Sequence, residues 1–512
     1  MSDRPGEEFA EQPTDPPGAW DEVLTSDVGP EPRTSGRLQG GGGHSVSTLV
    51  RPSRTDPVVR AASAVIGGPA GRRMGTGRSR FGPGGGRVWI VTVLVLMSAV
   101  TLGFGLIEKQ HCRNDGWSTP DQFWHACYSD IAVLYGSAGL GTKQPPTLVD
   151  AVGKNGLGQP PLASAAMWAV SKLVHGENAA AIRTYFDVSA IVLAGLLAIA
   201  VACVAAAAGR RPWDAAQLAL APVLITVGLL SYDLLAVTLL AGGLLAWTRR
   251  HPLVAGVLLG VAITARPITA AVLLAVLALS VRTGQTRGAL TLVSAVVSWL
   301  AVRQLLLPGW GGQLGDAFSG WKQSGPGYGS TWLVPNLISQ SKPSTIPVWY
   351  TGGGLSAGTT TLCAMMGLVV VAMATLVLGL SSDDRPRLVH LALFATAGSL
   401  LVTKSLPVQA SLVLLPLVAL SGLRWRDHLI WAATELVYFV GIWLYIAGET
   451  TPNRGLPPVF YLVMLTARLA GIAWIGVQGV LVYRAPSDVV PSDLAVDNPD
   501  QPSPAVDRFL LR

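Results

Sequence analysis

Long stretches with almost no charged side chains recur along this chain and constrain its fold more than any other feature. Only 13% of its 512 residues are Asp, Glu, Lys or Arg, whereas 50% are hydrophobic. Soluble domains carry about 25% charged residues. A run of about 18 or more apolar residues is long enough to cross a bilayer as a helix. The sequence therefore predicts an all-α polytopic membrane protein.

The apolar runs divide into about twelve predicted transmembrane helices. Six single helices are placed at about 88–107, 186–208, 288–307, 355–380, 428–447 and 457–482. Three longer runs, at 213–247, 253–281 and 388–421, each contain a polar interruption and are predicted to be pairs of helices. The interruptions lie at Ser231 to Asp233, at Arg266-Pro267 and at Lys404 to Pro407. Proline cannot continue the hydrogen bonding of a helix, which favours a break at the last two.

The basic residues indicate the orientation of these helices. They gather at the ends of apolar runs and form no stripe with interleaved aromatic residues, so the net charge of +7 does not indicate a nucleic-acid partner. Arginines crowd the entrance of the first helix, between Arg72 and Arg87. The positive-inside rule then places both termini in the cytoplasm. The predicted location of the protein is the plasma membrane. Two long loops, about 108–185 and 308–354, are predicted to be extracytoplasmic, and the apolar stretch 161–174 of the first is predicted to be an interfacial helix.

The two ends of the chain differ in composition from the rest. Residues 1–86 are rich in Gly, Pro, Ser and charged residues, and the tail 485–512 repeats Pro and Asp. Such segments cannot bury enough apolar surface to offset chain ordering. We expect disordered cytoplasmic regions at both ends of a transmembrane domain that covers residues 87–484.

The polar interruptions all fall on the predicted outer side. The polar residues placed there are Asp130, Asp233, Arg266, Lys404 and Gln409. An acid and several cations at a membrane surface are typical of a site for a lipid-linked phosphate, where the acid acts as a base and the cations hold the phosphate. The alternative for each residue is an interfacial charge that extends to water.

Four further polar or sulfur-containing side chains lead to structural predictions. Cys112 and Cys127 share the first outer loop, where a disulfide would stabilise the chain by roughly 3 kcal/mol and fix the backbone near Asp130. Two free thiols are the alternative. Glu435 and Arg468 lie inside apolar helices, and a buried ion pair explains them most simply. No paired Cys or His spacing typical of zinc and no nucleotide-binding loop occurs, so no metal and no cofactor are predicted.

Several short motifs, in order, resemble actinobacterial membrane proteins of the GT-C glycosyltransferase superfamily, and in particular glycosyltransferase family 87. The motifs are Cys112-Arg113-Asn114-Asp115-Gly116-Trp117, Cys127-Tyr128-Ser129-Asp130, Leu134-Tyr135, Tyr232-Asp233-Leu234-Leu235-Ala236, Gly256-Val257-Leu258-Leu259-Gly260, Ala265-Arg266-Pro267, Thr403-Lys404 with Gln409, Leu414-Leu415-Pro416 and Glu435-Leu436-Val437-Tyr438-Phe439. The similarity extends over about 88–483. It differs from the usual pattern at Gln159-Pro160-Pro161, where relatives tend to have an acidic residue.

The resemblance implies a polyprenyl-phosphate-sugar-dependent transferase, in family 87 a mannosyltransferase. Asp130 would be the general base for the acceptor hydroxyl, and Arg266 and Lys404 would bind the donor phosphate. Asp233 and Gln409 would support them. The implied partners are a polyprenyl-phosphate sugar carrying mannose or a pentose, an envelope glycan or glycolipid acceptor, and membrane lipid.

Two other functions remain open at this point. One is a flippase or transporter of a lipid-linked intermediate, although no internal repeat is evident and the polar residues gather at one face. The other is an inactive relative that acts as an envelope scaffold, which the altered motifs would favour.

Overall fold

The computed structural model describes residues 58–59, 61, 85–153, 156–209, 211–308, 319–341, 354–382, 385–451 and 454–484. Within these ranges the chain is helical and contains no strand. The all-α prediction is confirmed for this part of the chain. The regions predicted to be disordered, 1–86 and 485–512, lie outside the described residues except for positions 58–59, 61, 85 and 86.

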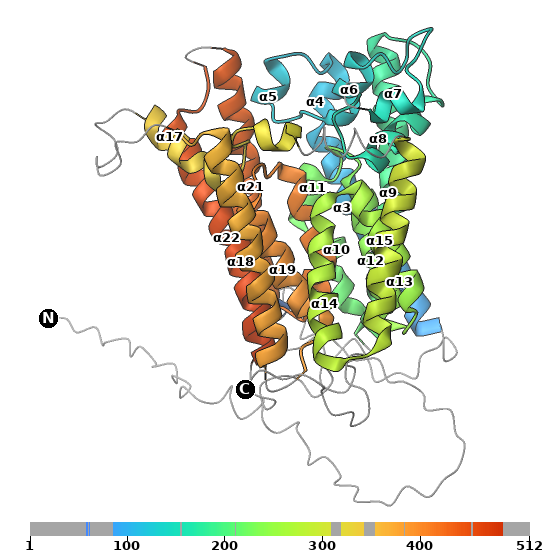
Figure 1. Ribbon diagram of the computed structural model, residues 1–512. Coiled ribbons are helices and arrows are strands. Elements are labelled where there is room, and N and C mark those ends of the chain that lie inside the picture. Colours follow the sequence, from blue (N-terminus) through green and yellow to red (C-terminus); the bar gives the residue numbers. More distant parts are fainter. Residues whose placement is uncertain are drawn as a thin grey trace, which may run out of the picture. The chain divides into compact units, whose positions relative to one another are not determined.

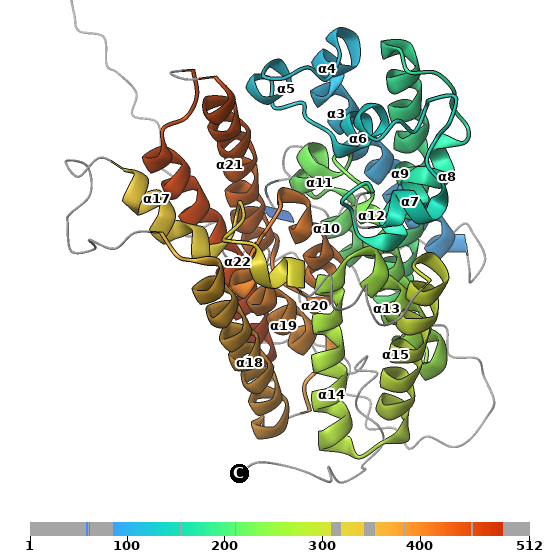
Figure 2. The same ribbon diagram turned by 45° about the horizontal axis from the view of Figure 1, so that its top comes forward.

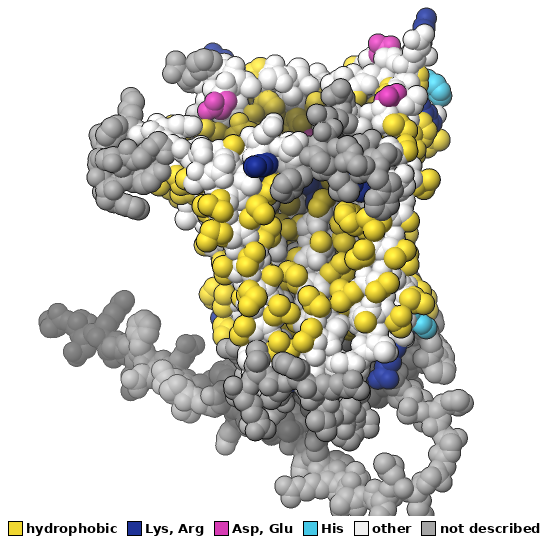
Figure 3. Space-filling model, in the orientation of Figure 1, with side chains coloured by type: hydrophobic (Ala, Val, Ile, Leu, Met, Phe, Trp, Pro, Cys, Tyr) yellow, Lys and Arg dark blue, Asp and Glu magenta, His cyan; other side chains and the backbone are white. Residues whose placement is uncertain are grey.

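Among the residues that the structure describes, six helices are long and apolar enough to cross a membrane. They are α3 (Gly85–Glu108), α9 (Ala179–Ala207), α15 (Thr286–Leu306), α18 (Ala357–Ser381), α21 (Trp425–Thr450) and α22 (Pro458–Arg484). A helix rises 1.5 Å per residue, so about 20 residues match the hydrocarbon thickness. Figure 3 shows hydrophobic side chains over the middle of the visible face, with charged side chains near its two ends. This pattern is the one that a lipid-facing surface requires, and the polytopic prediction is confirmed.

Shorter apolar helices complete the bundle. They are α12 (Asp233–Thr248), α13 (Pro252–Ala265), η2 (Pro267–Ala270) with α14 (Ala271–Thr283), α19 (Leu388–Val402), and η4 (Val408–Val413) with α20 (Leu414–Ser421). All three predicted interruptions are present, because α12 begins at Asp233, α13 ends before Arg266-Pro267, and no helix covers 403–407.

The first half of the predicted pair at 213–247 differs from the prediction of a continuous helix. It consists of three short pieces, η1 (Pro212–Ala215), α10 (Ala216–Ala219) and α11 (Pro222–Val227). Pro222 has no N–H to donate and occupies the first position of α11, where that donor is not needed. The helical hydrogen bonding therefore stops before Pro222 and starts again at it.

Both predicted outer loops carry short helices at the same end of the bundle (Figures 1 and 2). The first loop contains α4 (Gln110–Asp115), α5 (Asp121–Trp124), α6 (Asp130–Ser137), α7 (Leu148–Val152) and α8 (Pro161–Ser171). The second contains η3 (Thr331–Leu333) and α17 (Val334–Gln340). Helix α8 coincides with the predicted interfacial helix at 161–174, although it ends at Ser171.

Two glycines allow α13 and α15 to approach each other closely. On α13, Gly256 and Gly260 face α15 so closely that an added Cβ would lie 2.3 Å from the Thr291 carbonyl oxygen and 2.1 Å from that of Ala295. Such Gly-x-x-x-Gly spacing allows the backbones of membrane helices to approach. Only glycine fits at these two positions.

The predicted ion pair between Glu435 and Arg468 is confirmed. Arg468 Nε of α22 donates to Glu435 Oε2 of α21 over 2.9 Å, and both side chains are buried. The same guanidinium donates to the carbonyl oxygens of Leu406 at 2.7 Å and Pro407 at 3.0 Å. A buried charge needs such partners. The pair therefore holds in place the segment that precedes Gln409.

Candidate functional site

Asp130 is the first residue of α6, and neutral donors surround its carboxylate. The Tyr128 hydroxyl donates to Oδ1 at 2.8 Å. Oδ2 accepts from the side-chain amides of Gln159 at 3.2 Å and Gln409 at 3.4 Å. The three donors come from the turn before α6, the turn before α8, and η4. The site therefore joins the first loop to a segment almost 280 residues further along the chain.

A buried serine attaches the start of α6 to the bundle. The Ser129 hydroxyl donates to the Leu229 carbonyl oxygen at 2.9 Å and to that of Leu230 at 3.2 Å. Those two carbonyls lie between α11 and α12, just before Asp233. The bond therefore fixes Asp130 close to the N-terminus of α12.

Asp233 and Arg266 form a two-pronged ion pair at that N-terminus. Arg266 Nε donates to Asp233 Oδ1 and Nη2 donates to Oδ2, and the Ser231 hydroxyl also donates to Oδ2. Asp233 is buried, and only 13% of the Arg266 side chain is exposed. Arg266 follows the last residue of α13 because Pro267 stops that helix. Within the described part of the chain, its Nη1 has no hydrogen-bond partner.

The charges of this pair act on Asp130. Burial raises the pKa of Asp130 to about 6; the Tyr128 hydrogen bond opposes the rise, Asp233 adds to it, and Arg266 and Gln159 oppose it. Burial also raises the pKa of Tyr128, so its hydroxyl stays protonated and can donate. A carboxylate with a pKa near 6 is ionised at neutral pH and is still basic enough to accept a proton.

Lys404 lies in a different environment. Its buried Nζ donates to the Trp321 carbonyl oxygen at 2.6 Å and to Thr361 Oγ1 at 2.9 Å, and it lies 4.8 Å from the centre of the Trp321 ring. The described residues show no hydrogen bond or ion pair between Lys404 and either Asp130 or Arg266. Four of the five predicted polar residues therefore come together. Lys404 instead connects the Gln409 segment (residues 403–409) to the second loop and α18.

The segment around Lys404 is held by the second loop. The Gly327 amide donates to the Lys404 carbonyl oxygen at 2.7 Å, and the Leu406 amide donates to the Tyr328 carbonyl oxygen at 3.0 Å. Gly329 has a φ of +76°, and an added Cβ there would lie 2.0 Å from the Leu406 oxygen. Glycine is therefore required where this loop crosses the Gln409 segment.

Three residues near Asp130 had no place in the sequence-based site. Tyr128 and Gln159 contact the carboxylate directly. Lys109 is fully buried, with Nζ 2.9 Å from Glu108 and 3.4 Å from the Ala126 carbonyl oxygen. Burial lowers the pKa of Lys109, and the charges of Glu108 and Asp130 oppose that shift. Tyr128 stands two residues before Asp130 in a motif of the resemblance, and Gln159 stands where the chain departs from the family pattern. These two positions were the available signals.

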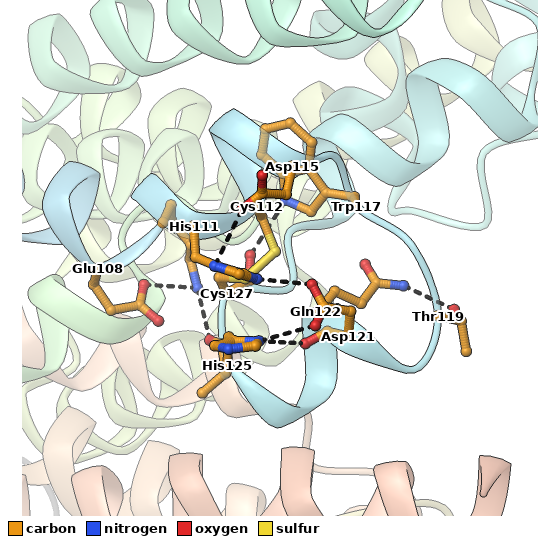
Figure 4. The surroundings of a disulfide bond; sticks show 12 residues. Glu108, His111, Cys112, Asp115, Trp117, Thr119, Asp121, Gln122, His125 and Cys127 are labelled. Carbon is orange, nitrogen blue, oxygen red and sulfur yellow. Dashed lines mark hydrogen bonds and ion pairs between the residues drawn. A yellow bond between two sulfur atoms is a disulfide. The ribbon is translucent and has the colours of Figure 1, made fainter.

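Cys112 and Cys127 form a disulfide with a Cα–Cα distance of 5.8 Å (Figure 4). The bond links two cysteines that are 15 positions apart in the sequence and joins α4 to the turn that leads into Asp130. Trp117 Nε1 adds a hydrogen bond to the Cys127 carbonyl oxygen at 3.2 Å. The backbone before Asp130 is thus anchored from the α4 side as well as through Ser129.

Metal-binding side chains gather elsewhere in this loop. Among the residues that the structure describes, His111, Asp121 and His125 form a group of three that could hold an ion. Asp130, Asp233 and Arg266 are not part of it.

The fold and this site define a polytopic α-helical membrane protein in which an acid, a salt-bridged cation and amide donors meet at one end of the bundle. Residues 160–404 match the model of glycosyltransferase family 87. The resemblance to that family is therefore confirmed over slightly less than half of the chain, and the family implies a membrane glycosyltransferase. The match includes Asp233, Arg266 and Lys404. No curated protein and no solved structure matches the chain.

Proposed function

We propose that this protein transfers a sugar, mannose or a pentose, from a polyprenyl-phosphate donor to a hydroxyl group of a cell-envelope glycan or glycolipid. The reaction takes place at the outer face of the plasma membrane, with both termini of the chain in the cytoplasm. One observation supports this most: the Asp130 carboxylate, with its pKa near 6, lies beside the Asp233–Arg266 pair at the end of the bundle that carries both long loops.

The proposed chemistry is a single displacement. Asp130 accepts the proton of the acceptor hydroxyl. At the same time the oxygen of that hydroxyl forms a bond to the anomeric carbon of the sugar. The bond between that carbon and the phosphate oxygen breaks, and polyprenyl phosphate leaves with the electron pair. General-base catalysis of this kind contributes about 10²- to 10⁴-fold to the rate.

Arg266 and Lys404 are assigned to the donor phosphate. Arg266 already offers Nε and Nη2 to Asp233, so its Nη1 is the group left to meet a phosphate oxygen. The Lys404 ammonium has three donors, two of which bond Trp321 and Thr361. In this proposal the donor lies between the α13 end and the Gln409 segment, Asp233 orients Arg266, and Gln409 orients the Asp130 carboxylate.

The test is a transfer assay with the purified full-length protein in lipid nanodiscs and, in separate reactions, polyprenyl-phosphate [¹⁴C]mannose and polyprenyl-phosphate [¹⁴C]pentose, with envelope glycolipid extract as acceptor. Radiolabel in the glycolipid that depends on the protein supports the proposal. Parallel assays in proteoliposomes follow movement of the labelled lipid between leaflets. Leaflet movement without transfer would identify a flippase. The absence of both transfer and leaflet movement would identify a scaffold. Either result contradicts the proposal.

A further inference from the structure

Two histidines beside the disulfide both contact the carboxylate of Asp121. Asp121 Oδ2 lies 2.7 Å from His111 Nε2, and Asp121 Oδ1 lies 3.2 Å from His125 Nδ1. The imidazole rings are stacked with their centres 3.6 Å apart. Figure 4 shows both rings turned toward the Asp121 side chain. One donor atom from each of the three residues lies within 4.8 Å of the other two.

We infer that this group binds one divalent transition-metal ion of the zinc type. The ligands are His111 Nε2, His125 Nδ1 and a carboxylate oxygen of Asp121. Two imidazole nitrogens and one carboxylate form a common zinc ligand set, which leaves a fourth position for water. Zinc–nitrogen bonds of about 2.0 Å require ligand atoms roughly 3.3 Å apart. The two printed contacts run to different oxygens of Asp121, 2.7 Å for Oδ2 and 3.2 Å for Oδ1, so the three side chains rotate when both nitrogens and one oxygen face a single ion.

A second carboxylate orients the first ligand. His111 Nδ1 lies 3.3 Å from Asp115 Oδ2, on the opposite side of the ring from Asp121. A metal-bound histidine usually donates its other ring N–H to such a carboxylate, which fixes the tautomer and the direction of the ring. Asp115 supplies that partner from the same helix, α4.

The backbone holds the ligands together before any ion binds. His111 precedes Cys112, and His125 stands two residues before Cys127, so the disulfide brings the two histidines together across 14 residues of sequence. This explains why sequence spacing gave no sign of a zinc site. His111 and Asp121 are each about one-third exposed, and His125 is about half exposed, so an ion can enter from solvent.

The bound ion would form a second cross-link in this loop, between α4 and α5 and beside the disulfide. It lies in the loop that leads into Tyr128 and Asp130, but none of its ligands contacts Asp130 in the described structure. The inference therefore stands apart from the proposed transfer reaction and is tested by binding alone.

The experiment is calorimetric titration of zinc chloride into the full-length protein in detergent micelles, after dialysis against a chelator. The expected result is one zinc ion per chain. His111→Ala, His125→Ala and Asp121→Asn should each weaken binding by at least about tenfold. His175→Ala is the matched control, because His175 is an exposed histidine of the same loop and should leave binding unchanged.

Cobalt(II) in place of zinc provides a second readout that depends on the ligand set. Its visible d–d absorption should change in Asp121→Asn, which retains the size of the side chain and keeps the test valid if a histidine variant fails to fold. Absence of zinc binding by the wild type would overturn the inference. So would equal binding by the wild type and by the His111→Ala, His125→Ala and Asp121→Asn variants, since the ion would then lie elsewhere.

Discussion

The first residues of α6 and α12 are both aspartates, and they have opposite kinds of partners. Asp233 is buried and paired with the Arg266 guanidinium through two hydrogen bonds. Asp130 accepts hydrogen bonds from a phenol and two amides, none of which carries a charge. Both oxygens of Asp233 are engaged by the guanidinium, whereas neutral groups alone meet the oxygens of Asp130. In the proposed mechanism Asp130 therefore handles the proton, while Asp233 positions the cation.

Asp130→Asn should have the largest effect on transfer. The amide keeps the shape of the side chain but cannot accept the proton, so the rate should fall by about 10²- to 10⁴-fold. Initial rates of radiolabel transfer measure this. Glu177→Gln, which removes an exposed carboxylate from the same loop, is the control and should retain wild-type activity. Transfer by Asp130→Asn at the wild-type rate would remove Asp130 from the mechanism.

Arg266→Gln should have the largest effect on stability. It leaves Asp233 buried without its ionic partner, and loss of one partner of a buried pair costs about 3 kcal/mol or more. Thermal unfolding in detergent should show a clearly lower midpoint than for Arg183→Gln, which changes an exposed arginine of α9. Equal midpoints would mean that the Asp233–Arg266 pair does not stabilise the folded protein.

The pH dependence of the transfer rate tests the assignment of Asp130 as the base. Transfer needs ionised Asp130, and burial raises the pKa of that group to about 6. The rate should therefore be constant above pH about 7 and fall below pH 6, reaching about one-tenth of the plateau at pH 5. Rate–pH profiles at low substrate concentration measure this. A rate that stays flat down to pH 5 would contradict the assignment.

Tyr128→Phe should shift that profile. The Tyr128 hydroxyl favours the charged form of Asp130, so its removal raises the pKa of Asp130 further. The acidic limb should then move upward by about one pH unit, because a hydrogen bond to a charged group contributes about 1.5 kcal/mol. A downward shift would show that the hydroxyl stabilises the neutral acid instead.

Most of the fold could be predicted from the sequence, because membrane helices are defined by length and the absence of charge. Arg266-Pro267 and Ser231 to Asp233 marked real helix ends, since a proline and a polar cluster interrupt an apolar run. The broken stretch from Pro212 to Val227 was missed because its apolar character does not distinguish one helix from three short ones.

The site was only partly predictable. Asp130, Asp233, Arg266 and Gln409 could be grouped because each interrupts the apolar pattern on one predicted side. The partner of each side chain could not be derived, because contacts such as Gln409 with Asp130 depend on how distant helices pack. Lys404 is a second example: the sequence placed it on the same side of the membrane but could not give the bonds of its ammonium to Trp321 and Thr361.

The most direct test of the base assignment is chemical rescue with formate. Asp130→Ala and Asp233→Ala are assayed for transfer with and without sodium formate, with sodium chloride as the control for ionic strength. Formate can replace a missing carboxylate base but cannot rebuild a salt bridge that positions an arginine. The account predicts that formate restores part of the transfer in Asp130→Ala and none in Asp233→Ala. Rescue of Asp233→Ala alone would contradict it.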